Sequence, residues 1–161
     1  MKTAIALASV LALASPALAD DTKEGWGFQF RQDTFEKALF PLAMMSEDGD
    51  GFDKALVAFA CGSDGKLVAF FQPERFMMFA EASKVQFRAG DITNDFTFSV
   101  GDVPHLGKRL IVDTAKSDEL AQIFASAAGG EVPFRTDKKQ GVFTSIGAAE
   151  TFTIVRGHCP K

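Results

Sequence analysis

The sequence has 161 residues and a formal net charge of −4 at pH 7, with 17 Phe, one Trp and no Tyr. An acidic chain lacks the basic surface of nucleic-acid-binding proteins and is equally unsuited to anionic membranes. Because Phe is purely apolar, most of these rings are expected in a hydrophobic core. The length fits one domain.

Residues 1–19 have the pattern of a cleavable secretory signal peptide. Lys2 supplies the positive charge, Ile5–Leu13 the short apolar run, and Ala17–Ala19 the small-residue cleavage site. The apolar stretch is short for a membrane span, which needs about 20 residues, so no stable membrane insertion is expected. We therefore predict cleavage after Ala19 and a single domain over residues 20–161, in the bacterial periplasm or secreted, with its net charge shifted to −5 by the loss of Lys2.

Two strands are predicted at the start of this domain. Trp26, Phe28 and Phe30 alternate with glycine or polar residues, which is the period of a half-buried strand. Lys37–Met45 is a second apolar run, and Pro41 restricts it to an edge strand or a bulged strand.

The acidic segment that follows resembles a calcium loop in composition alone. It contains Glu47, Asp48, Asp50 and Asp53. A calcium loop needs a bidentate Glu at its twelfth position, where this chain has Phe59. We interpret the cluster as a solvated hairpin tip and predict no metal site.

The clearest supersecondary signal is a β-hairpin. Ala55–Cys61 and Lys66–Gln72 are nearly continuous apolar runs around the turn Gly62–Gly65. Continuous runs predict a central hairpin buried on both faces. Ser63 and Lys66 also match the Ser-x-x-Lys acylating motif, but that motif works at the start of a helix and not in a tight turn.

The second half of the chain mixes strands and helices. Short strands are predicted at Val85–Arg88, Phe96–Val100, Leu110–Asp113, Val132–Arg135 and Val142–Ser145. A loop is expected to begin at Gly101. A helix is predicted over Thr114–Ala128, capped by Ser117 and ended by Gly129. Residues 147–158 fit both a β-branched strand and helical spacing.

These elements predict an α+β fold. We expect a mostly antiparallel sheet or small β-sandwich with one or two late helices. Cys61 and Cys159 are an even pair in an oxidising compartment, which predicts one disulfide.

The histidines, His105 and His158, occur in no metal-ligand spacing. His105 has Asp102 nearby as for a general base, but no nucleophile motif accompanies it, and a surface role is favoured. We predict no catalytic residues and no cofactor.

One apolar segment has two interpretations. Phe70–Phe79 contains four Phe and two Met, interrupted by Pro73, Glu74 and Arg75. Its last part, Phe76, Met77, Met78 and Phe79, is either ordinary core or, if exposed, a candidate partner surface.

The order of features resembles small exported bacterial proteins that include accessory proteins associated with type VI secretion. It comprises Trp26 in an N-terminal strand, Cys61 before a hairpin, the strand segment Val85–Arg88, a Phe143-x-x-x-Gly147-Ala148 element and Cys159. The resemblance covers most of residues 26–159. It implies a Cys61–Cys159 bridge, a helix over 147–158 and no catalytic residues.

Two functions remain open from the sequence. The first is a non-enzymatic binding or accessory protein whose partner is another envelope or secreted protein. The alternative is an inhibitor of a cell-wall hydrolase such as lysozyme, since an acidic domain suits a cationic enzyme.

Overall fold

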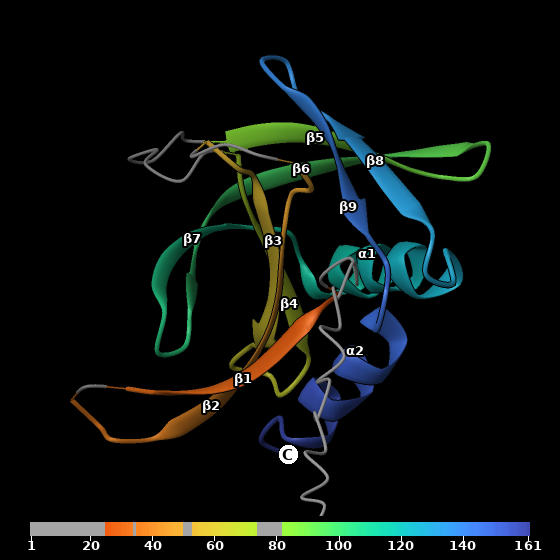
Figure 1. Ribbon diagram of the computed structural model, residues 1–161. Helices are drawn as coiled ribbons and strands as arrows, with labels where there is room; N and C mark the ends of the chain where they lie inside the picture. The colour runs from red at the N-terminus through yellow and green to blue at the C-terminus, as the bar shows by residue number, and fades with distance from the viewer. Residues whose placement is uncertain (1–24, 34, 50–52, 74–81) are drawn as a thin grey trace, which may run out of the picture.

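The computed structural model describes residues 25–33, 35–49, 53–73 and 82–161 (Figure 1). Its elements in chain order are β1 (Gly27–Gln32), β2 (Leu39–Ser46), β3 (Leu56–Cys61), β4 (Leu67–Gln72), β5 (Ala82–Ala89), β6 (Ile92–Val103), β7 (Gly107–Ile111), α1 (Thr114–Ser126), β8 (Glu131–Arg135), β9 (Gln140–Thr144) and α2 (Ala148–Gly157).

The described strands form one antiparallel sheet in the order β1-β2-β3-β4-β7-β6-β5-β8-β9. The sheet curls around its helices so that its two ends meet (Figure 1). The Trp26 backbone N–H donates to the Ile146 carbonyl at 2.8 Å, and its indole N–H donates to the Thr144 carbonyl at 3.0 Å. The predicted α+β class, with a mostly antiparallel sheet and late helices, is confirmed.

Aromatic rings fill the space between the curled sheet and the helices. Trp26 packs edge-on against Phe124 of α1 and Phe152 of α2, with ring centroids 4.9 and 4.7 Å apart. It also contacts Phe59 of β3 at 5.6 Å. The Phe-rich composition therefore forms the core, as the sequence predicts.

The central β3–β4 hairpin is buried on both faces, which confirms that prediction. On one face, Val57 and Phe59 join the aromatic core. On the other face, Ala58 and Ala60 join a smaller cluster with Phe70 of β4. Successive side chains of a strand point to opposite faces of the sheet. Because Ala55–Cys61 contains no polar residue, it places apolar side chains on both faces.

The neighbouring strands differ from expectation in two places. β2 lies between β1 and β3 and is not an edge strand, yet Pro41 is tolerated because pairing with β3 starts only at Leu42. Gly101 does not begin a loop. It lies within β6 and pairs with Arg109 of β7, since the turn comes later, at Pro104.

Helix α1 begins one turn before the predicted cap. The Asp113 carboxylate, not Ser117, accepts the Lys116 backbone N–H at 2.8 Å. Ser117 is instead fully buried, and its hydroxyl accepts the Ala69 backbone N–H at 2.9 Å. This hydrogen bond lies beside a weakly paired part of the sheet, where β4 and β7 share the single register pair Phe70↔Ile111.

Residues 147–158 are resolved in favour of a helix. Ala148, Phe152 and Val155 face the core from α2, so helical spacing overrides the β-propensity of the Thr and Ile residues.

The predicted disulfide is present and follows α2. Cys61 and Cys159 are bonded, with Cα atoms 5.3 Å apart. The bridge brings Pro160 onto the β3–β4 turn. Gly65 of that turn has a φ of +74°, and a Cβ there would collide with the Pro160 carbonyl oxygen.

Candidate functional site

The tip of the β1–β2 hairpin is organised by one aspartate. The Asp33 Oδ1 atom accepts the backbone N–H groups of Phe35 and Glu36, each at 2.8 Å. The Lys37 N–H donates to the Asp33 carbonyl at 3.0 Å. Asp is favoured in turns for this reason, because its short carboxylate reaches the amides just beyond it.

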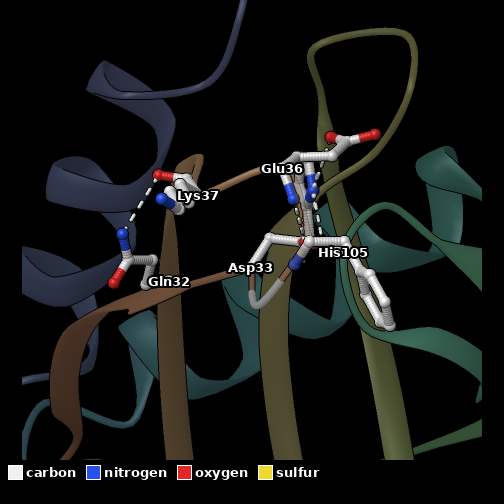
Figure 2. Close-up of polar contacts among 6 residues, drawn as sticks. Gln32, Asp33, Glu36, Lys37 and His105 are labelled. Carbon is white, nitrogen blue, oxygen red and sulfur yellow. Dashed lines mark hydrogen bonds and ion pairs between the residues drawn. The ribbon is translucent and has the colours of Figure 1, made fainter.

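A histidine from a second hairpin reaches this tip. His105 lies in the β6–β7 turn, 72 residues along the chain, and its Nδ1 atom is 3.3 Å from Asp33 Oδ2 and 3.5 Å from Glu36 Oε2. Figure 2 shows the three side chains pointing toward one another, with Lys37 set apart beside Gln32. We call Asp33, Glu36 and His105 the tip cluster.

The backbone and the neighbouring ring fix the position of the imidazole. His105 adopts a φ of +62°, a left-handed conformation that is uncommon outside glycine. Its ring stacks on Phe40 of β2, with centroids 5.2 Å apart and planes at 17°. The imidazole is therefore held across the end of the β1–β2 hairpin.

The tip also sets the charge of its aspartate. The backbone N–H groups of Glu36 and then Phe35 lower the pKa of the Asp33 carboxyl below its usual value of 3.8, and His105 lowers it further. Partial burial opposes this shift. The carboxylate is consequently ionised throughout the physiological pH range.

The same hairpin exposes large apolar side chains. Phe35 is 96% exposed and Leu39 67% exposed, and Phe30 of β1 is also exposed. Phe30 also lines a hollow of about 490 Å³, together with His105 and Arg109. The tip therefore combines apolar surface, two carboxylates and one imidazole.

A second hollow lies across β5, β8 and β9. It has a volume of about 630 Å³, and Arg88 and Arg135 are in its lining. The Arg135 guanidinium donates to the Gln86 side-chain oxygen, and the Gln86 amide donates to Asp95 at 2.7 Å. These contacts hold Arg135 in a surface network with Gln86 and Asp95, and Glu131 also lies in the lining of the hollow.

The motifs noted in the sequence are not assembled into a catalytic site within the described residues. Ser63 and Lys66 lie in the tight β3–β4 turn. His158 contacts the Ile154 carbonyl at 2.8 Å at the end of α2. Asp102 pairs across the sheet with Lys108, while His105 turns to Asp33 and Glu36.

The candidate partner surface predicted from the sequence falls on a segment that the structure does not describe. Phe76, Met77, Met78 and Phe79 lie outside the described residues.

The prediction that the acidic cluster forms a solvated hairpin tip is wrong for Glu47, its first residue. Glu47 is largely buried, accepts the Ala55 N–H at 2.9 Å and forms an ion pair with Lys139 at 2.6 Å. The Lys139 ammonium also donates to the Asp53 carbonyl. The carboxylate thus ties the β2–β3 connection to the β8–β9 turn.

Sequence reasoning missed Asp33 and Glu36. Their pairing with His105 spans two hairpins, and no spacing rule covers such a separation. The signal that could have marked the tip is Phe35, a large apolar residue in a short polar segment between two strands.

Comparison with protein-family models, curated proteins and solved structures finds no match to this chain. Neither α1 nor α2, the helices of the described residues, is long and apolar enough to cross a membrane.

Proposed function

We propose that this protein is a non-enzymatic binding or accessory protein of the bacterial envelope, exported by the signal peptide at residues 1–19. Its partner is another envelope or secreted protein, docked on the β1–β2 hairpin. The observation that carries this proposal is the 96% exposure of Phe35 at the end of that hairpin. The resemblance to secretion-associated accessory proteins supports the same class of function.

An exposed aromatic ring at the end of a projecting hairpin suits docking into a pocket. Binding energy in protein interfaces concentrates in a few central aromatic or Arg side chains, surrounded by weaker contacts. Phe30 and Leu39 supply apolar surface next to Phe35, and the tip cluster supplies charge beside it. Pairing with β3 from Leu42 onward holds the base of the hairpin, and Asp33 accepts the N–H groups of Phe35 and Glu36 in its turn, which reduces the ordering that docking requires.

The test compares two exposed apolar residues far apart on the molecule. Phe35→Ala changes the hairpin tip, and Ile92→Ala changes a residue 66% exposed at the β5–β6 turn, on the opposite side of the view in Figure 1. A partner is first captured from envelope extract by the purified protein and then titrated with each variant. We expect Phe35→Ala to weaken the complex by about thirtyfold or more, as for an interface hot spot. Equal affinity of both variants and the wild type would exclude docking on the tip.

A second candidate is the inhibitor of a cell-wall hydrolase, favoured by the carboxylates at a projecting tip. Carboxylates at the end of a projecting hairpin, on a chain with a net charge of −4, are complementary to the active-site cleft of a cationic enzyme. The purified protein should slow peptidoglycan lysis by lysozyme at near-stoichiometric amounts, and Glu36→Gln should relieve the inhibition. Lysis at an unchanged rate across several lysozyme types would eliminate this candidate.

A further inference from the structure

We propose that Asp33, Glu36 and His105 bind a divalent transition-metal ion of the zinc type at the end of the β1–β2 hairpin. One ligand atom from each of the three side chains lies within 4.8 Å of the other two. His105 Nδ1 has Asp33 Oδ2 and Glu36 Oε2 as its neighbours. They come from two hairpins that the fold brings together, so the site exists only in the folded chain. No metal site is predicted here from the sequence, because no ligand spacing connects these residues.

The distances fit a tetrahedral ion. Bonds of about 2.0–2.1 Å from a tetrahedral zinc to nitrogen and oxygen place the ligand atoms about 3.3–3.4 Å apart. The imidazole nitrogen lies 3.3 Å from the Asp33 oxygen and 3.5 Å from the Glu36 oxygen. The Glu36 side chain is 69% exposed, so a rotamer change can adjust the separation of the two carboxylate oxygens around the ion.

Two of the three ligands are already oriented. Asp33 spends one carboxylate oxygen on the backbone N–H groups of the turn, which leaves Oδ2 as a single directed donor. The His105 ring is held by Phe40 with Nδ1 toward the carboxylates. Outer contacts of this kind orient ligands in metal sites and raise their affinity.

The charge of the cluster also suits a dication. Two ionised carboxylates and a neutral imidazole carry a charge of −2. Among the described residues, no Lys or Arg forms an ion pair with Asp33 or Glu36, whose ionic contacts are with His105. A metal ion binds the unprotonated imidazole nitrogen, so zinc and a proton compete for the same atom of His105.

The mixed donor set selects the class of metal. Imidazole nitrogen suits zinc and its neighbours, whereas calcium and magnesium prefer oxygen ligands alone. With three protein ligands, the fourth position of a tetrahedral ion is left for water or for a group of a docked molecule.

The inference does not depend on partner docking, because it is tested on the purified protein alone. Titration with zinc chloride, followed by calorimetry, should give one ion per chain. Asp33→Asn is the sharpest variant, since its amide oxygen can still accept the turn N–H groups while its NH₂ group cannot bind a metal. We expect Asp33→Asn and His105→Ala each to weaken zinc binding by about tenfold or more.

His158→Ala is the matched control, because His158 contacts a backbone carbonyl and forms no ion pair with a carboxylate among the described residues. It should bind zinc as the wild type does, and excess magnesium should not compete. No zinc binding by the wild type, or equal affinity in the wild type and the His105→Ala variant, would overturn the proposal. Equal loss in the His158→Ala variant would do the same.

Discussion

Phe59 and Phe35 carry the same side chain in opposite settings. Phe59 lies in the central strand β3 with no exposed surface, 4.5 Å from the Phe152 ring and 5.6 Å from Trp26. Phe35 is 96% exposed at the end of a hairpin and forms no ring contact with the other described residues. The difference separates two uses of phenylalanine. A buried ring stabilises the fold by leaving water, whereas an exposed ring leaves its apolar surface available to a ligand.

The most direct way to break this comparison is to truncate both rings. Phe59→Ala should lower the free energy of unfolding by about 3–5 kcal/mol, because it removes apolar contacts and leaves a cavity. Phe35→Ala should change it by less than about 0.5 kcal/mol, as at other exposed positions. Urea unfolding measures both values. A similar loss in the two variants would mean that the hairpin tip is packed against the rest of the chain.

The disulfide tests whether the interior can be loosened without touching the tip. Cys61→Ser should cost about 2–5 kcal/mol, since the bridge closes a loop with a sequence separation of 98. Amide exchange should rise first in α2, which the bridge holds, while the Asp33 turn keeps its protection. The unreduced, denatured wild type should contain no reactive thiol, and two thiols per chain would contradict the pairing.

Ser117 sharpens the comparison from the polar side, because it is a hydroxyl inside the apolar core. Ser117→Ala leaves the Ala69 N–H without its acceptor, which should cost about 1–3 kcal/mol. Ser126→Ala, an exposed position on the same helix, is the control and should lie within about 0.5 kcal/mol of the wild type. Thermal unfolding of both variants measures the difference in stability. Equal stabilities would show that the hydrogen bond from the Ala69 N–H to Ser117 contributes nothing measurable.

The smallest effect is expected at the tip itself and depends on pH. The folded state lowers the pKa of Asp33 below 3.8, so its ionised form stabilises the fold above that pH. The stabilisation is lost as the pH falls through the lowered pKa. The stability difference between the wild type and Asp33→Asn should therefore shrink between pH 5 and the acid limit of folding, in a series of urea titrations. A difference that grows toward low pH would reverse the assignment.

The sequence allowed much of the core to be predicted and little of the tip. Continuous apolar runs identified the β3–β4 hairpin, and parity identified the Cys61–Cys159 bridge, because both signals are local or binary. The tip cluster depends on how β6–β7 lies against β1–β2, which no short-range pattern encodes. Ser117 illustrates the same limit. A serine near the start of a helix predicts a cap, and only the folded chain shows that its hydroxyl accepts the Ala69 N–H of β4 instead.

Gly65 shows what the bridge demands of the sequence around it. A φ of +74° alone would still allow Asn at position 65. Asn should likewise be tolerated at position 90, where Gly90 has a φ of +58° and open space around it. The Pro160 carbonyl oxygen above Gly65 removes that option, because it leaves no room for any Cβ. Among variants selected for stability, position 65 should therefore remain glycine, whereas position 90 should accept other residues. Substitution at position 65 should become tolerable only in chains that have also lost the Cys61–Cys159 bond.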